Sequence, residues 1–176
     1  MDRTINLHLS ELQKLSSQTE ECSPSALCTY VNAAEAILHA VTFSVNTKSP
    51  GVKGLQSSVV NNGIIPALLR LGQYEQPVGY ETLQILCYRN PVNCNLLVEN
   101  GVVTNIASRL STSQPVLQTA MCFLLTAIAA FSDSSHSCII KSGLVPQLVM
   151  CCKSKEVCTT GESSFAALQT HAAAVL

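Results

Sequence analysis

Tryptophan is absent from the 176-residue sequence, aromatic residues make up only 5% of it, and charged residues only 12%. Ten basic residues nearly balance eleven acidic ones, so a general electrostatic attraction to nucleic acid or to an anionic membrane has no support. No apolar run reaches the ~20 residues that span a bilayer, and the start of the chain lacks the apolar centre of a secretory signal. We therefore expect no nucleic-acid partner and no membrane insertion.

The motifs of common catalytic sites are missing as well, since the sequence contains no GxSxG, P-loop, GxGxxG or HExxH. Nine cysteines are present, but they show no CxxC spacing and do not cluster with the four histidines. Their odd number and irregular spacing argue against a disulfide framework, so we expect most of them to be reduced, buried and apolar in character. The sequence thus predicts an intracellular, cytoplasmic protein that is not an enzyme and has no catalytic residue, metal site or cofactor.

The sequence contains one short pattern in three copies. The copies are "NNGIIPALLRL" from 61 to 71, "ENGVVTNIASRL" from 99 to 110, and "KSGLVPQLVMCC" from 141 to 152, with glycines at 63, 101 and 143. These glycines lie 101 − 63 = 38 and 143 − 101 = 42 positions apart. A glycine in the left-handed conformation can end one helix, and a proline three residues later suits the first turn of another. Each phrase therefore predicts a corner between two helices, and its recurrence predicts a repeat protein.

Apolar spacing predicts further helices between the corners, and no strand. They are expected at 6–15, 26–43, 77–88, 115–131 and 164–176. Polar stretches at 16–25, 46–54, 132–137 and 153–164 are expected to be links, which makes His136 a loop residue. The segment 115–131 is nearly uncharged and apolar on most sides, so we expect it to be a central helix.

Three stretches of the sequence resemble the armadillo repeat: "GIIPALLRL" (63–71), "GLVPQLVMC" (143–151) and "LQILCYRNPVNCNLLVENG" (83–101). HEAT repeats are the nearest structural alternative. The resemblance implies an all-α, right-handed α-solenoid of about four armadillo-like repeats, the first divergent and the last truncated. These repeats, approximately 1–62, 63–100, 101–142 and 143–176, would form a single domain over 1–176. Because the sequence stops within a helical pattern, we expect a fragment of a longer protein.

In the armadillo family the third helix of each repeat lines a concave groove that holds an extended peptide. Matching the repeats implies partner-binding positions at Glu35, His39, Glu81, Ile85, Phe123 and Ala127. The resemblance implies a non-enzymatic protein-protein interaction scaffold of the kind found in ciliary, centrosomal, adhesion or signalling assemblies, with cytoskeletal or centrosomal association. The acidic residues at positions 35 and 81 indicate a basic or polar partner.

Two other functions stay open. The chain can instead be a structural or self-association segment, which stacks on further repeats of its own chain or on another copy. A nuclear-import adaptor is disfavoured, because none of the matched positions has the asparagine or the tryptophan that such adaptors use to hold a peptide.

Overall fold

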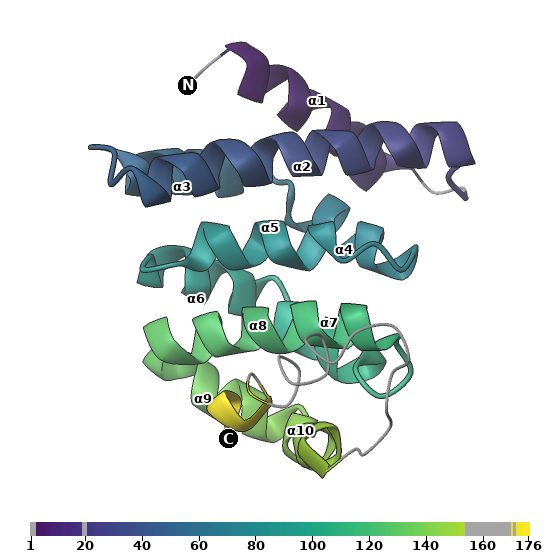
Figure 1. Cartoon of the computed structure of the whole chain (residues 1–176), viewed down its shortest axis with the longest axis vertical. Coiled ribbons are helices and arrows are strands. Elements are labelled where there is room, and N and C mark those ends of the chain that lie inside the picture. The colour runs from purple at the N-terminus through teal and green to yellow at the C-terminus, as the bar shows by residue number, and fades with distance from the viewer. Residues whose placement is uncertain (1–2, 19–20, 154–169, 171) are drawn as a thin grey trace.

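A computed structural model describes residues 3–18, 21–153, 170 and 172–176, and every regular element in these residues is a helix (Figure 1). The helices are α1 (Arg3–Ser17), α2 (Pro24–Asn46), α3 (Val52–Asn61), α4 (Ile65–Gln73), α5 (Val78–Cys87), α6 (Pro91–Glu99), α7 (Val102–Arg109), α8 (Pro115–Phe131), α9 (Asp133–Lys141) and α10 (Leu144–Lys153). Residues 172–175 form a short additional helical piece. The predicted all-α class is confirmed.

Four helices expected from the apolar spacing are confirmed as α1, α2, α5 and α8, and α8 begins and ends at the predicted residues. The expected link at 46–54 is shorter than predicted, because α3 already begins at Val52. Of the helix expected at 164–176 the structure describes only the end, which is helical at 172–175. The expected link at 153–164 lies almost entirely outside the described residues.

The expected polar link at 132–137 is wrong, because α9 begins at Asp133. Its polar side chains suit a helix with one exposed side. Ser135 is buried and its hydroxyl donates hydrogen bonds to the carbonyls of Ser132 at 2.6 Å and Ile128 at 3.3 Å. His136 is an exposed residue of this helix rather than a loop residue.

The three corners are confirmed. Gly63, Gly101 and Gly143 have φ values of 73°, 74° and 77°, and they separate α3 from α4, α6 from α7, and α9 from α10. A Cβ added to any of them would meet nothing within 4 Å, so glycine is needed here for its backbone conformation and not for space.

The helices are stacked in layers that repeat along the long axis of the molecule. Helix α5 packs between α2 and α8 (Figure 1), and behind this row α3 contacts α6, which in turn contacts α9. The buried apolar side chains form one continuous cluster, from Leu12 in α1 through Leu86 in α5 to Leu148 in α10. The chain is therefore an all-helical, repeat-like stack with one core.

A buried network of polar side chains joins α3 to the end of α5 and the start of α6. The Gln56 amide donates to the carbonyls of Ile85 at 2.8 Å and Tyr88 at 3.1 Å. The Asn93 amide donates to the Leu86 carbonyl at 2.8 Å. Both of these side chains are at most 1% exposed, so their hydrogen bonds replace those that water would make.

The same junction recurs 42 positions later with different side chains. Ile128 corresponds to Leu86 (128 − 86 = 42) and Ser135 to Asn93 (135 − 93 = 42), and the Ser135 hydroxyl again donates to the matching carbonyl. The repeat is thus visible in the hydrogen bonds as well as in the corners.

Helices α4 and α5 cross at very short range. A Cβ added to Gly79 would overlap the carbonyl oxygen of Leu68, and one added to Gly72 would lie 2.5 Å from the ring of Tyr80. Tyr80 is fully buried, and its hydroxyl donates to the Asn105 side chain at 2.8 Å. Two glycines therefore allow these helices to touch and hold the tyrosine between them.

Candidate functional site

The helices α2, α5 and α8 lie side by side and present one shared side to the viewer of Figure 1. We call this side the front face and define it by six residues that are exposed or half-buried: Glu35, His39, Phe43, Glu81, Ile85 and Phe123. Each helix buries its opposite side in the core, so the residues left on the front face are those available to a partner.

Helix α2 supplies the most exposed part of the front face. Glu35 and His39 are both exposed, and they lie four residues apart, so they share one side of the helix. Phe43, one turn further on, is 69% exposed. Ile37 and Val41 are fully buried, which fixes how α2 is turned. The structure thus brings both predicted residues of this helix to the surface.

Helix α5 supplies Glu81 and Ile85, which are half-buried. The pKa of Glu81 is raised above its ordinary value, first by burial and then by the negative charge of Glu35 on the adjacent helix. Within the described residues neither carboxylate forms an ion pair. The two acidic residues therefore form an uncompensated negative site between α2 and α5.

Helix α8 exposes one of the two residues expected from it on a partner-binding face. Phe123 is 40% exposed, whereas Ala127 is only 6% exposed and so offers almost no surface to a partner. Helix α8 packs against α5, α6 and α9, and the thiol of Cys94 in α6 lies 4.0 Å from the Ala127 carbonyl. Exposed positions on α8 recur only every seven residues, at Val116, Phe123 and Ala130.

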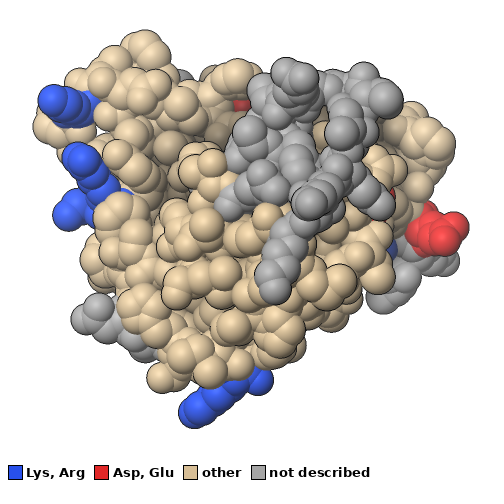
Figure 2. All heavy atoms as spheres, turned by 60° about the horizontal axis from the view of Figure 1, so that its bottom comes forward, with Lys and Arg blue, Asp and Glu red and all other residues tan. Residues whose placement is uncertain are grey.

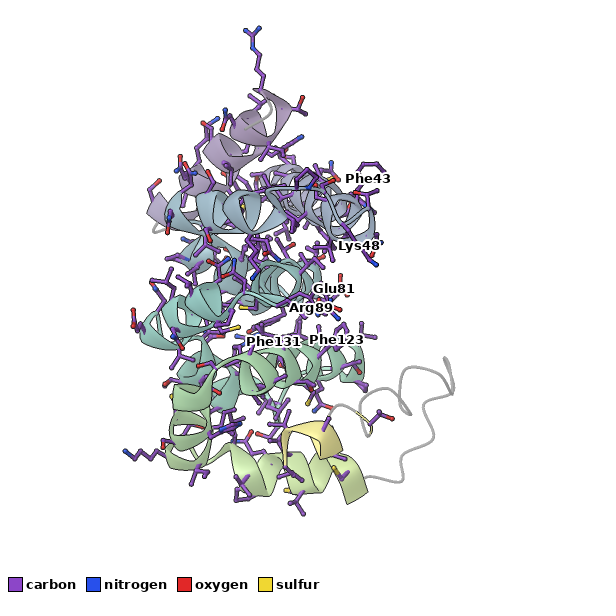
Figure 3. The ribbon with its side chains drawn as sticks, turned by 90° about the vertical axis from the view of Figure 1, so that its left-hand side faces the viewer. Phe43, Lys48, Glu81, Arg89, Phe123 and Phe131 are labelled. Atoms are coloured by element: carbon purple, nitrogen blue, oxygen red, sulfur yellow. The ribbon has the colours of Figure 1, made fainter. Side chains whose placement is uncertain are left out.

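Sequence reasoning did not identify two basic residues beside the front face. Lys48 and Arg89 are both exposed, and each follows the last residue of its helix, α2 or α5, by two positions. Their φ values of 50° and 54° place both in the left-handed conformation that often follows a helix. Figure 3 shows them on the same side of the stack as Phe43 and Glu81. The feature of the sequence that could have identified them is a Lys or Arg just after the end of a predicted helix.

The described cysteines are mainly interior residues, as expected, although Cys28 is exposed. The pKa of Cys122 is raised by its hydrogen bond with Cys151 and by burial, while that hydrogen bond lowers the pKa of Cys151 to about 7. Cys87 and Cys94 form a similar buried pair. Among the residues that were placed, no three His, Cys, Asp or Glu side chains lie where they could share a metal ion. These thiols belong to the core.

Two surface hollows occur at matching positions beside the corners. One, of about 230 Å³, is lined by Val60, Asn61, Gly63, Ile65, Pro66, Leu96 and Asn100, and the other, of about 500 Å³, by Thr104, Ser137, Cys138, Lys141 and Ser142. Cys138 and Ser142 in the second correspond to Leu96 and Asn100 in the first, 42 positions earlier. The hollows are thus a product of the repeat, and their different linings give them no common chemistry.

Helix α2 is the one helix in the described ranges that is long and apolar enough to cross a membrane, judged by length and composition. It packs against α1 and α5 within the stack. Glu35 and His39 occupy the middle of its exposed side, where contact with lipid would be costly.

No protein-family model matches the chain, and no curated protein matches it in sequence. The crystal structure of an engineered protein is similar to it, with a TM-score of 0.71 and 18% sequence identity over 99% of this chain. The chain spans 61% of the length of that engineered protein. At such low identity the likeness shows the fold alone. The class that the fold defines is an all-helical protein of helical-repeat-like architecture.

Proposed function

We propose that the chain is a non-enzymatic scaffold whose front face binds an extended segment of a protein partner. The observation that supports this most is the pair of uncompensated carboxylates on adjacent helices, Glu35 and Glu81, on the same face as the exposed ring of Phe43. Exposed aromatic side chains and unpaired charges on a rigid surface are features of protein-binding sites. The proposed setting is the cytoplasm.

The armadillo-type, right-handed solenoid is part of this proposal. It is supported by glycine corners spaced 38 and 42 residues apart and by the direct packing of α2, α5 and α8 in one row. An extended segment that crosses such a row meets successive helices at the interaxial spacing of about 8–10 Å. One partner can therefore contact several units at once.

A site-specific cross-linking experiment tests the proposal. A photoreactive phenylalanine analogue replaces His39 on the front face or, as a control, Ser108, which is exposed on α7. We expect cross-links from position 39 to one peptide of a partner protein and none to that peptide from position 108. Cross-links to a partner only from position 108 would contradict the proposal.

A second function, assembly through the end of the stack, is favoured by a comparison between repeats. Ile140, three residues before its corner glycine, is 67% exposed, whereas Val60 at the same position is 4% exposed. Figure 2 shows that the described surface at this end is largely uncharged, with lysine or arginine side chains at its left and lower rim and acidic side chains at its right-hand rim. Sedimentation of the chain and of Ile140→Lys distinguishes the two functions: a concentration-dependent oligomer that this substitution abolishes would favour assembly.

A further inference from the structure

We infer that the front face selects an extended peptide of alternating charge, with a Lys or Arg side chain against Glu35 and Glu81 and an Asp or Glu side chain against Lys48 and Arg89. The inference rests on the proposed function, since it names the class of partner that the front face binds.

The two acidic residues form one edge of the site. Glu35 and Glu81 come from helices that pack directly against each other, and the negative charge of Glu35 raises the cost of ionising Glu81. No Lys or Arg within the described residues neutralises them. A basic side chain of a partner would offset both the repulsion and the cost of holding a negative charge in a partly buried position, so the acidic edge favours a cationic group.

The two basic residues form the opposite edge. Lys48 and Arg89 follow α2 and α5 at equivalent positions, and both sit in tight turns with positive φ. The Arg89 guanidinium lies 5.3 Å from the centre of the Tyr88 ring, which holds it in place. Neither residue has an acidic partner in the ranges that the structure describes. Each of these cations is therefore available to a carboxylate of a partner.

The distance between the edges suits an extended chain. Glu81 lies in the first turn of α5, about 9 Å along the helix from its last residue, Cys87, and Arg89 follows two positions beyond that end. Ile85 lies midway between Glu81 and Arg89 in the sequence and gives the site an apolar floor. Successive side chains of an extended peptide point in opposite directions, so a peptide that runs from α2 to α5 directs alternate residues to the two edges. Alternating charge matches both edges at once.

The charge distribution also argues against a phosphate-rich partner. A membrane surface or a nucleic acid would contact Lys48 and Arg89, but it would bring negative charge close to Glu35 and Glu81. A peptide can place opposite charges on alternate residues, whereas a nucleic acid or an anionic lipid surface presents mainly negative charge.

Fluorescence anisotropy with four labelled 12-residue peptides tests the inference. The peptides are alternating Lys-Glu, alternating Lys-Ala, alternating Glu-Ala, and a block peptide of six Lys followed by six Glu, all measured in low salt. We expect the Lys-Glu peptide to bind at least about tenfold more tightly than the block peptide of identical composition. Equal binding of these two peptides would overturn the inference, because it would show attraction to overall charge only.

Two substitutions then test whether the peptide preference of the front face can be changed. Glu81→Lys leaves Glu35 beside a new lysine and so removes the net negative charge of the acidic edge, which should shift binding toward the Glu-Ala peptide. Arg89→Glu likewise removes the net positive charge of the basic edge and should shift binding toward the Lys-Ala peptide. Glu99→Lys and Lys141→Glu are the matched controls, because both residues are exposed and lie on α6 and α9. Thermal unfolding verifies that all four variants are folded. A control that changes the preference as much as the front-face variants do would also overturn the inference.

The outcome is separable from that of the cross-linking experiment. If position 39 forms cross-links but the alternating and block peptides bind equally well, the alternating-charge partner is rejected and the scaffold proposal remains. Cross-links only from position 108 would reject the scaffold itself.

Discussion

The second and third repeats place large and small side chains in opposite order at the same point of the core. The second has Gly79 followed by Tyr80, and the third, 42 positions later, has Met121 followed by Cys122. The last three of these are fully buried, and Gly79 is buried as well. The second repeat brings α4 and α5 into direct contact, whereas α7 and α8 approach each other less closely. Both repeats therefore keep a packed core, although they place their large and small side chains at different positions. This explains why a shared architecture is compatible with dissimilar sequences.

The largest loss of stability is expected where α4 and α5 cross in the second repeat. In Gly79→Ala the new methyl group would overlap the Leu68 carbonyl oxygen, which belongs to the backbone and cannot move aside. We expect the free energy of unfolding to fall by about 3 kcal/mol, even after the gain in helix propensity. Urea unfolding measures the loss. A variant as stable as the wild type would show that the helices are further apart than described.

The matching substitution in the third repeat removes volume instead. Met121→Ala leaves a cavity in the fully buried layer of α8, and we expect a loss of about 2–3 kcal/mol. Met121→Leu is the control, because it nearly conserves volume and should cost less than about 1.5 kcal/mol. If the alanine and leucine variants were equally stable, Met121 would not be a packing residue.

The polar junctions are expected to differ in strength. Asn93→Ala removes the bond to the Leu86 carbonyl and the acceptor for the Ser57 hydroxyl, which lies 3.2 Å away, so we expect a loss of about 2 kcal/mol. Ser135→Ala removes one hydroxyl that makes a 2.6 Å and a 3.3 Å bond, and a loss of about 1 kcal/mol is expected. Equal losses in chemical denaturation would contradict the idea that the first junction is the tighter one.

These two junctions also show what the sequence could and could not predict. The corners were predictable because glycine, its flanking apolar pairs and proline are local signals. The matching roles of Asn93 and Ser135 were not, because the common feature is a distant carbonyl that either side chain can reach. For the same reason the sequence predicts a loop where α9 lies: Ser135 makes buried hydrogen bonds that local polarity does not reveal.

The sequence indicates most of the exposed and half-buried residues of the front face, but not the burial of every position matched to it. Glu35, His39, Glu81, Ile85 and Phe123 reach the surface or its margin, because the repeat spacing places them correctly along their helices. Ala127 does not, since the rotation of α8 is fixed by its contacts with α6 and α9. Rotation depends on the neighbours of a helix, and those are not encoded locally.

A smaller effect is expected from Tyr80 at alkaline pH. Burial raises the pKa of Tyr80 to about 12, so between pH 10 and 12 the unfolded chain releases this proton while the folded chain retains it. Stability should therefore fall with rising pH in this window, by at most about 2 kcal/mol. Tyr80→Phe should lose about 1 kcal/mol at pH 7, with its bond to Asn105, but lack the alkaline loss. Parallel pH profiles of the two proteins would contradict this role.

The smallest effect is expected on the front face. Because the pKa of Glu81 is raised, its ionisation opposes folding, and stability should decline as pH rises through that raised pKa. Glu81→Gln should therefore be slightly more stable than the wild type at pH 7, by less than about 0.5 kcal/mol, and should have no advantage at pH 3. Thermal melts at both pH values provide the measurement, with Glu99→Gln as the control. A destabilised Glu81→Gln would mean that the carboxylate has a cationic neighbour.

The open space around the three corner glycines has a consequence for chemical synthesis. What disfavours L-amino acids there is the handedness of the backbone, since an added methyl group would touch nothing. D-alanine favours the same left-handed region and would fit each corner without strain. A mirror-image residue could therefore stiffen all three bends, where L-alanine would be strained.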